Sequence, residues 1–287
     1  MLEQDLKRYF GFNEFRPYQR EIIQHILDKK DVVSILPTGS GKSLCYQLPA
    51  LLNSGITIVV SPLISLMQDQ VLQLTKQGIA AAFINSSLDG WTRDDIMRNI
   101  SDYKLIYVSP ERLVMDDFKQ SLKPHVISGF VIDEAHCISQ WGHSFRMEYR
   151  NLSRLKVEYP GVPISAFTAT ATEDVETDIA TQLNLPNPTH VKGSFDRDNL
   201  TIRIQEKESY EKQVLAFLQD KKNDSGIIYA GTRKRVEKLH AVLLAKGFKV
   251  GRYHAGLAEE ERSSTLKEFI YEHLDVVVAT LAFGMGI

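Results

Sequence analysis

The stretch Val32-Val33-Ser34-Ile35-Leu36-Pro37-Thr38-Gly39-Ser40-Gly41-Lys42-Ser43 carries the strongest structural signal in this sequence. Its first five residues are small or apolar and rich in Val and Ile, which predicts a strand buried on both faces. The glycines that follow let successive backbone N–H groups turn inward around phosphate oxygens, and a helix is expected to begin at about Lys42. The stretch therefore predicts a strand, a phosphate-binding loop and a helix in succession.

The residue types in this loop predict a nucleotide site for ATP and Mg²⁺. We expect Lys42 to reach the β- and γ-phosphates and the hydroxyl of Ser43 to ligate Mg²⁺. A GSGKS string can also be a flexible turn, and Leu36 stands where such loops usually begin with glycine. The position between a strand and a helix favours nucleotide binding. The expected cofactor-binding residues of the loop are Thr38, Gly39, Ser40, Gly41, Lys42 and Ser43.

The same order of predicted strand, polar cluster and helix recurs along the chain. Short apolar runs stand at 32–36, 56–60, 105–108, 130–132, 164–167, 226–229, 250–253 and 275–279. Segments with helical periodicity, such as 65–77 and 233–246, lie between them. This alternation predicts an α/β fold of parallel sheets flanked by helices, in which ligands bind at the carboxyl ends of the strands. The polar clusters could be mere turns, but turns do not explain the charged residues found in them.

The composition limits the classes of protein to which this chain can belong. The chain has 287 residues, of which 43% are apolar and 24% charged, which favours two globular domains and excludes disordered and collagen-like chains. No apolar run approaches the length that spans a bilayer, and the N-terminal segment lacks the apolar core of a secretory signal. Cys45 and Cys137 are too few for a disulfide framework or a four-cysteine zinc site. We expect a cytoplasmic protein with no membrane contact.

Charge and turn residues suggest where the chain divides. The net charge is −2, with −4 over residues 1–206 and +2 over 207–287, so any site for a polyanion must be a local patch. The segment 183–189 (LNLPNPT) is rich in turn residues, and 193–212 is expected to run from a strand into charged sequence. We place the linker near 205–210, between a first domain of residues 1–206 and a second of 207–287.

An acidic pair follows the apolar run at 130–132. Asp133 is suited to hold Mg²⁺ through its water shell, and Glu134 to orient and deprotonate the attacking water. An acidic helix N-terminus is the alternative interpretation. The phosphate loop 91 residues earlier and the adjacent His136 favour catalysis, with Lys42, Asp133, Glu134 and His136 as the expected catalytic residues.

Several longer strings together resemble the RecQ family of superfamily 2 DNA helicases. They are FGFNEFRPYQREII (10–23), LPTGSGKSLCYQLPA (36–50), VVSPLISLMQDQV (59–71), YVSPERL (107–113), DEAHCISQWGHSFR (133–146), FTATAT (167–172), YHAGL (253–257) and VVATLAFGMGI (277–287). The match covers nearly the whole chain. It implies two RecA-like P-loop domains, the second incomplete. It also implies an ATP-dependent DNA helicase and DNA-stimulated ATPase that moves 3′ to 5′ and acts in DNA repair and recombination.

The resemblance also implies roles for individual residues. Gln19 would read the adenine edge, and Phe12 and Arg16 would sandwich the ring, although Phe12 could instead be a core aromatic. Residues 137–149 would form an aromatic-rich loop that couples single-stranded DNA to ATP hydrolysis. Trp141 could instead be packed in the core, and Arg233 could lie on a solvated helix face. The implied DNA-binding or coupling residues are Ser61, Pro62, Gln140, Trp141, His143, Phe145, Arg146, Thr168, Thr170, Thr232, Arg233, His254 and Thr280.

The implied partners are single-stranded DNA, tailed or forked duplex DNA, and repair and replication proteins. A monomer in the cytoplasm, near the bacterial nucleoid, is expected. The family pattern continues past Ile287 with an arginine-containing motif, so a chain ending there is expected to hydrolyse ATP weakly. The alternative is a truncated nucleotide- and DNA-binding module with little turnover. A third possibility is an RNA helicase of related type. Only the family-specific loop disfavours it, because the sequence offers no independent group that would read a 2′-hydroxyl.

Overall fold

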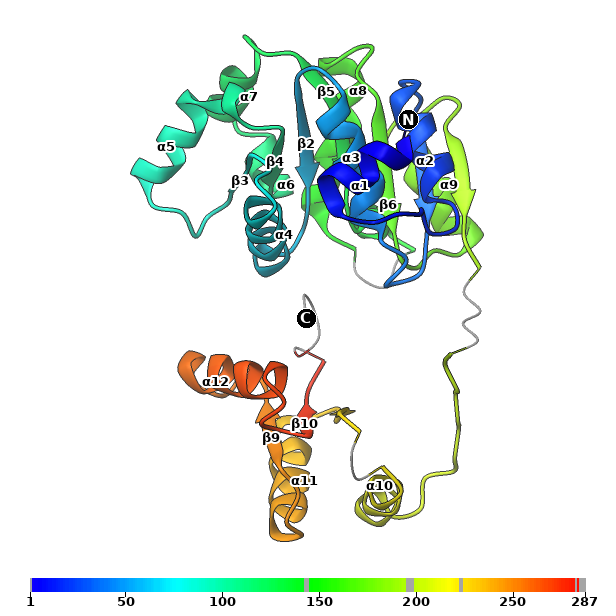
Figure 1. Cartoon of the computed structure of the whole chain (residues 1–287), viewed down its shortest axis with the longest axis vertical. Coiled ribbons are helices and arrows are strands. Elements are labelled where there is room, and N and C mark those ends of the chain that lie inside the picture. The colour runs from blue at the N-terminus through cyan, green and yellow to red at the C-terminus, as the bar shows by residue number, and fades with distance from the viewer. Residues whose placement is uncertain (1, 142–144, 195–198, 222–223, 282, 284–287) are drawn as a thin grey trace. The chain divides into compact units, whose positions relative to one another are not determined.

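The computed structural model describes residues 2–141, 145–194, 199–221, 224–281 and 283. The chain divides into two compact units, Met1–Asn199 and Leu200–Ile287 (Figure 1). This division lies a few residues before the expected boundary at 206, and the expected linker, 205–210, belongs to the second unit.

The first unit is built on a seven-stranded parallel sheet, within the part of the chain that the structure describes. The strand order is β3-β4-β2-β5-β6-β1-β7, and every neighbouring pair is parallel. All carboxyl ends of the strands therefore meet at one edge. The strands are β1 (Val32–Ile35), β2 (Ile56–Val60), β3 (Ala81–Ile84), β4 (Leu105–Val108), β5 (Ile127–Ile132), β6 (Ile164–Thr168) and β7 (Thr189–Lys192).

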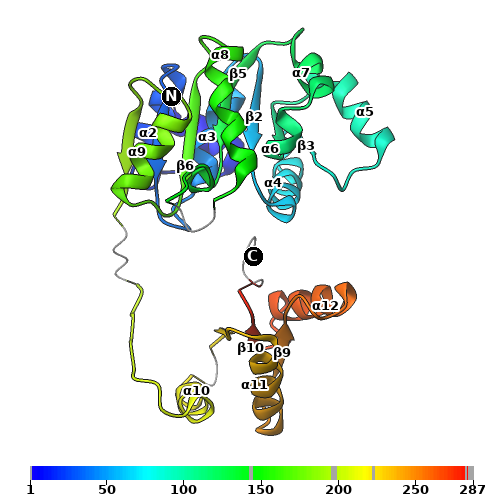
Figure 2. The ribbon, with the colours of Figure 1, turned by 180° about the vertical axis from the view of Figure 1, so that it is seen from behind.

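Helices cover both faces of this sheet, as Figures 1 and 2 show from opposite sides. One core lies between the sheet and α2, α3 and α4, and a second lies between the sheet and α5, α7, α9, η2 and η3. The helices are α1 (Leu2–Phe10), α2 (Gln19–Leu27), α3 (Lys42–Leu52), α4 (Ile64–Lys76), α5 (Gly90–Arg98), α6 (Pro110–Leu113), α7 (Asp116–Leu122), α8 (Leu155–Glu158) and α9 (Glu173–Gln182), with the 3₁₀ helices η1 (Ile100–Asp102), η2 (Ala135–Ile138) and η3 (Met147–Arg154). The sheet is therefore buried on both faces, which is why its strands read as continuous apolar runs.

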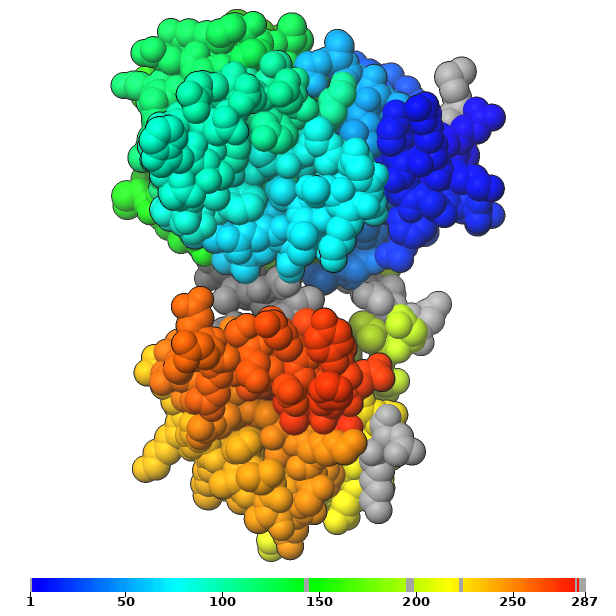
Figure 3. All heavy atoms as spheres, turned by 60° about the vertical axis from the view of Figure 1, so that its left-hand side comes forward, coloured from blue at the N-terminus to red at the C-terminus, as the bar shows by residue number. Residues whose placement is uncertain are grey.

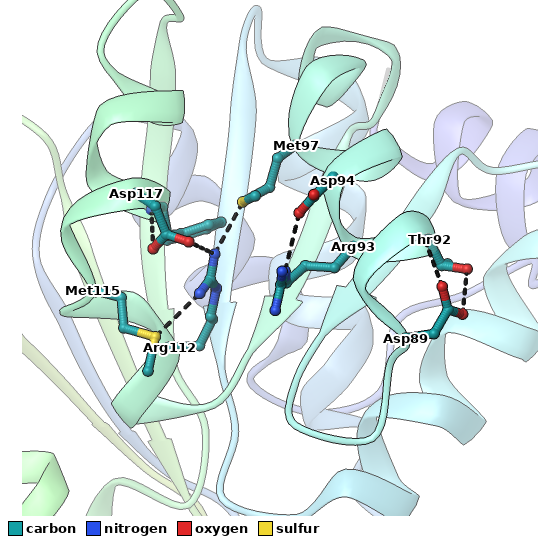
Figure 4. A network of polar contacts seen from close by, with 9 residues as sticks. Asp89, Thr92, Arg93, Asp94, Met97, Arg112, Met115 and Asp117 are labelled. Atoms are coloured by element: carbon teal, nitrogen blue, oxygen red, sulfur yellow. Dashed lines mark hydrogen bonds and ion pairs between the residues drawn. The ribbon is translucent and has the colours of Figure 1, made fainter.

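Arg112 ties together the helices beyond β4 (Figure 4). Its guanidinium donates to the Asp117 carboxylate at 2.7 Å and lies 3.0 and 3.1 Å from the sulfur atoms of Met97 and Met115. It also stands over the ring of Phe118, 5.8 Å from the centroid. One buried cation thus joins α5, α6 and α7, and it fixes the short helix that begins at the carboxyl end of β4.

The second unit contains a three-stranded parallel sheet of order β8-β10-β9 among its described residues. Its α12 has no buried residue, and the residues of this helix, drawn in orange, lie on the molecular surface in Figure 3. The elements are α10 (Tyr210–Gln219), β8 (Gly226–Tyr229), α11 (Arg233–Ala245), β9 (Val250–Tyr253), α12 (Glu259–Ile270) and β10 (Val276–Ala279).

The α/β class and the parallel sheets predicted from the sequence are confirmed, as is the helix beginning at Lys42. Two strands, β3 and β7, were not expected. The strand expected within 193–212 is wrong for the described residues of that stretch, because none of them pairs with a strand. Ile202 and Ile204 alternate with polar residues as in a strand, but their side chains are 86% and 93% exposed, and no strand in the described part of the chain pairs with them.

Among the described helices, none is both long enough and apolar enough to cross a membrane.

Gly55 allows the chain to pass close to residue 126 as it enters β2. Gly55 has a φ of 92°, and a Cβ there would lie 2.3 Å from the carbonyl oxygen of Val126. That carbonyl accepts a hydrogen bond from the amide of Ile56 at 2.9 Å. Gly78 has a similar φ of 75°, but no atom lies within 4 Å of its Cβ position. The two glycines share a left-handed backbone and differ in the space around it.

Alanine at these two positions should therefore destabilise the protein unequally. Both substitutions cost about 1–2 kcal/mol for a left-handed non-glycine residue. Gly55→Ala should lower the free energy of unfolding by a further 1–3 kcal/mol, roughly, because of the clash with Val126. Urea denaturation followed by circular dichroism measures both effects, and equal midpoints for the two variants would contradict the close approach.

Candidate active site

The phosphate loop leaves β1 at the carboxyl edge of the sheet and ends at the first turn of α3. Gly39 and Gly41 have φ values of 81° and 80°, which side chains with a Cβ rarely adopt, and Gly41 caps α3. The ammonium of Lys42 turns back and donates to the carbonyl of Leu36 at 3.2 Å. The glycines and the lysine thus form a backbone cradle at a helix N-terminus.

Gln19 holds this cradle from behind. Its side-chain amide donates to the carbonyls of Ser40 and Gly41, both at 3.1 Å, and its oxygen accepts from the backbone N–H of Arg16 at 2.9 Å. The guanidinium of Arg16 also donates to the carbonyl of Gly39. Gln19 is almost fully buried, whereas Phe12 is 54% exposed, which excludes Phe12 as a core aromatic. Two of the three residues expected to bind adenine, Gln19 and Arg16, therefore contact the phosphate loop directly.

Asp133 and Glu134 follow β5, with β6 between β5 and β1. The amide of Asp133 donates to the carbonyl of Val60 at 2.8 Å, and its carboxylate accepts from the amide of Glu134 at 3.0 Å. Glu134 has a φ of 48°, the left-handed region, immediately before η2. The hydroxyl of Tyr149 donates to the carbonyl of Asp133 at 3.1 Å. Three hydrogen bonds thus fix the backbone and carboxylate of the acidic pair.

The charges of the site are buried together. Burial lowers the pKa of Lys42, while Glu134 and Asp133 act in the opposite direction. Burial, followed by repulsion from Glu134, raises the pKa of Asp133 to about 7. Each charge is thus held in a site of low polarity, where a partner of opposite sign matters more than in water.

His136 connects the acidic pair to β6. Its Nδ1 lies 2.8 Å from the hydroxyl of Thr168 and 3.2 Å from the carboxylate of Glu134. Burial lowers the pKa of His136, but hydrogen bonds to Cys137 and Glu134 outweigh burial and raise it to about 9. The Thr168 hydroxyl donates in turn to the carbonyl of Thr170 at 3.2 Å. Residues expected to couple hydrolysis to movement thus form one bonded chain.

A nucleoside triphosphate with Mg²⁺ fits the residues at this edge. The loop has left-handed glycines at positions 39 and 41, and the buried hydroxyl of Ser40 has no hydrogen-bond partner among the described residues. Within that same part of the chain, no three His, Cys, Asp or Glu residues gather as a metal site. Mg²⁺ is commonly held by one or two protein oxygens together with phosphate oxygens and waters.

The aromatic-rich loop begins at η2 and is anchored on the first unit. The side chain of Trp141 is 79% exposed, which excludes packing in the core. The amide of Arg146 donates to the carbonyl of Cys137 at 2.9 Å, and its guanidinium donates to the carbonyl of Pro62 at 3.1 Å. Arg150 stands over the ring of Phe145, 5.4 Å from its centroid. His143 lies outside the described residues.

Two other residues implied to bind DNA lie at this edge. Ser61 is buried after β2, and its hydroxyl has no partner in the described part of the chain. Gln140 is exposed between η2 and Trp141. Arg146 thus joins the aromatic-rich loop to Pro62. The side chains of Gln140 and Trp141 are exposed to solvent.

In the second unit the four expected residues occupy different environments. Thr232 caps α11 by accepting from the amide of Arg235 at 3.3 Å, and the amide of Thr280 donates to Tyr253 at 3.1 Å. His254 is only 5% exposed, and both ring nitrogens are engaged, one with Glu237 at 2.7 Å and one with the amide of Gly256 at 3.1 Å. His254 therefore holds the loop after β9, and the side chain of Arg233 lies against that loop at Gly256.

Two residues that hold expected site residues in place were not predicted from the sequence. Tyr149 was expected only as the end of the aromatic-rich loop, but it is fully buried and supports Asp133. Glu237 on α11 pairs with His254 and with Arg252 on β9, and no local pattern marked it. The periodicity of α11 could have placed Glu237 on the sheet-facing side, but its partners are set by tertiary packing.

Comparison with known proteins supports this geometry. The profile of the DEAD/DEAH box helicase family matches residues 16–178, and that of the helicase conserved C-terminal domain matches residues 208–287. A solved structure of the DUF1998 helicase MrfA bound to DNA superposes with a TM-score of 0.76 at 19% identity, covering 99% of this chain and 42% of that one. At this identity the superposition shows the shared fold.

Two curated relatives are closer in sequence. The ATP-dependent DNA helicase RecQ of Haemophilus influenzae is 44% identical over 284 residues, which is 98% of this chain and 46% of the relative. A putative ATP-dependent RNA helicase of Acanthamoeba polyphaga mimivirus is 42% identical over the whole chain and 53% of its own length. The chain thus spans about half the length of these relatives. From its matched domains and its identity to RecQ proteins, the chain belongs to the DEAD/DEAH box helicases and, among them, to the RecQ family.

Proposed function

We propose that the chain is an ATP-driven DNA helicase motor that couples ATP hydrolysis to movement along single-stranded DNA, 3′ to 5′, and to opening of the duplex. The observation that carries this proposal is the convergence of Lys42, Asp133 and Glu134 at the ends of β1 and β5, the two strands on either side of β6. The aromatic-rich loop starts immediately after the acidic pair. The RecQ relatives, named as DNA helicases, support DNA as the nucleic acid.

In this proposal each residue has a defined task. Lys42 binds the terminal phosphates, Ser43 and Asp133 hold Mg²⁺, and Glu134 accepts the proton of the attacking water. The bound Mg²⁺ supplies positive charge that neutralises the phosphate oxygens. Gln19, Arg16 and Phe12 bind the adenine side. A change at the nucleotide site is transmitted to the rest of the first unit through the hydrogen bonds of His136, Thr168 and Thr170.

The remaining assignments are part of the same proposal. We infer that residues 1–206 form the nucleotide-binding domain and residues 207–287 a second RecA-like domain that adds DNA contacts at Thr232, Arg233 and Thr280. The DNA partners are single strands and tailed or forked duplexes, with repair and replication proteins beside them. A monomer acting at the bacterial nucleoid, in repair and recombination, is the corresponding cellular form.

One assay separates this function from its alternatives. Steady-state ATP hydrolysis is measured alone, with single-stranded DNA and with single-stranded RNA, beside unwinding of a 3′-tailed DNA duplex. Stimulation by DNA is the expected result. Binding of ATP and DNA without turnover would favour the binding module, and equal or stronger stimulation by RNA would favour the RNA helicase.

Glu134→Gln should stop hydrolysis and leave ATP binding intact. The amide cannot accept the proton of water, so the rate should fall by at least about 100-fold. Lys42 and the glycine cradle remain, so the affinity for a fluorescent ATP analogue should be unchanged. Glu173→Gln, at an exposed position of α9, is the matched control. Hydrolysis at the normal rate in the Glu134 variant would remove this residue from the chemistry.

Arg146→Ala should uncouple DNA from hydrolysis. Loss of the bond to Pro62 frees the aromatic-rich loop, so stimulation by single-stranded DNA should disappear while the basal rate remains. Arg154→Ala, at an exposed position of η3, controls for the lost charge. Full stimulation in the Arg146 variant would contradict the role of this bond.

Gln19→Ala should weaken nucleotide binding through the phosphate loop. Two bonds to loop carbonyls are lost, so affinity for ATP should fall by about tenfold. If the affinity for GTP falls as well, the fall common to both nucleotides reports the loss of the loop contacts. Any further fall in the affinity for ATP reports the loss of adenine recognition. Gln24→Ala, on the same helix but bonded to Asp28, is the control. Unchanged affinity for GTP would contradict the contact with the loop.

A further inference from the structure

A pocket of about 570 Å³ lies within the second unit, beside the N-terminal ends of α10 and α11. Its lining comes from residues 207–211, from residues 229–231 after β8, and from Arg235 and Lys238 on α11. The volume is in the range of about 300–1,000 Å³ that is typical of ligand sites. None of the residues expected from the sequence to bind DNA lines this pocket.

The pocket carries unpaired positive charge. Lys238 is neutralised by Glu211, at 2.5 Å. Lys207 and Arg235 are exposed, and in the described part of the chain their side chains form no ion pair. Glu208 is the remaining carboxylate of the lining, so cations exceed anions. Such a surface attracts an anion from solution.

The polar and aromatic groups of the lining suit a nucleotide strand. The hydroxyl of Tyr210 is buried and has no hydrogen-bond partner among the described residues, and the side chain of Ser209 does not cap α10. Tyr229 is 49% exposed, and its hydroxyl donates to the carbonyl of Phe283 at 2.9 Å, which fixes the direction in which the ring points. A fixed, exposed ring beside unpaired cations is the combination that binds single-stranded nucleic acid.

This pocket is separate from the contact expected at Arg233. The guanidinium of Arg233 lies 3.2 Å from the Cβ position of Gly256, on the side of α11 that faces the loop after β9. Residues two apart on a helix point about 200° apart, so Arg235 faces the opposite side, towards α10. The first turns of α11 therefore present basic groups on both sides.

We propose that this pocket is a second binding site for single-stranded DNA. Lys207 and Arg235 bind a phosphate of the strand, and the ring of Tyr229 stacks with a base. The proposal rests on the function proposed above, because it assumes that the chain binds DNA. It adds a contact that would extend the strand past α11 from the Thr232 and Arg233 side.

Charge reversal tests the phosphate contact. Affinity for a fluorescently labelled oligothymidylate is measured over a range of salt concentrations for the full chain and for Lys207→Glu and Arg235→Glu. Each reversal should weaken binding and reduce the slope of log affinity against log salt by about 0.7, the value for one phosphate of a single strand. Lys246→Glu, at the far end of α11 and outside the pocket, should leave both unchanged. Circular dichroism confirms that each variant is folded.

Substitution of Tyr229 tests the stacking. Tyr229→Ala should lower affinity for oligothymidylate by about fivefold or more without changing the salt slope. Tyr229→Phe keeps the ring and should restore most of the binding. An abasic strand should bind wild type and Tyr229→Ala alike, because it offers phosphates without bases.

Different failures have different meanings. If wild type binds oligothymidylate but both charge reversals keep its affinity and slope, the pocket is not a DNA site and the helicase proposal stands. If Tyr229→Ala weakens the abasic strand as much as oligothymidylate, the stacking is overturned. If the wild-type chain binds no single-stranded DNA, both proposals fail.

Discussion

A lysine ammonium and two carboxylates meet in a buried site at the ends of β1 and β5, and the first unit is organised to hold them there. Burial alone disfavours the charges of Lys42 and Asp133, as the lowered pKa of Lys42 and the raised pKa of Asp133 indicate. Their attraction for each other offsets part of this cost. The parallel sheet makes the meeting possible, because it brings the ends of separate strands to a common edge and buries the strands on both faces.

Short hydrogen bonds and an ion pair connect this site to neighbouring elements of the first unit. Glu134 reaches His136, His136 reaches Thr168, and Thr168 reaches the turn after β6. The segment after η2 is also joined to the end of β2, through the hydrogen bond from Arg146 to the carbonyl of Pro62. A change of charge at the acidic pair therefore has a continuous set of packed and bonded neighbours through which to act, which is the physical requirement for coupling between sites.

Patterns within a few residues predicted much of this arrangement. The runs of Val and Ile in β1, β2 and β10 identified buried strands, and the glycines before Lys42 identified the loop and the start of α3. The short β3 was missed because its apolar run contains no Val and a single Ile, and β7 was missed because only one of its residues, Val191, is buried. The residues near 202 have the alternation of a strand, but none of the described strands pairs with them.

The long-range contacts were beyond such patterns. Gln19 touches carbonyls more than 20 residues away, and Tyr149 donates to a carbonyl 16 residues earlier. The resemblance implied that His254 binds DNA, and the two partners of its ring, Glu237 and Gly256, are contacts that no local pattern predicted. Residue type gives the chemistry that a side chain can perform, whereas packing decides which partner it meets.

The left-handed backbone of Glu134 has a consequence for how this sequence can change over evolutionary time. A non-glycine residue in that conformation costs about 1–2 kcal/mol, and glycine or asparagine would adopt it more readily. Selection for stability alone would therefore tend to remove the glutamate. If position 134 changes to glycine in a lineage, the backbone there is less strained, but the carboxylate beside the phosphate loop is lost. The identity of this one residue therefore records whether selection still maintains the site.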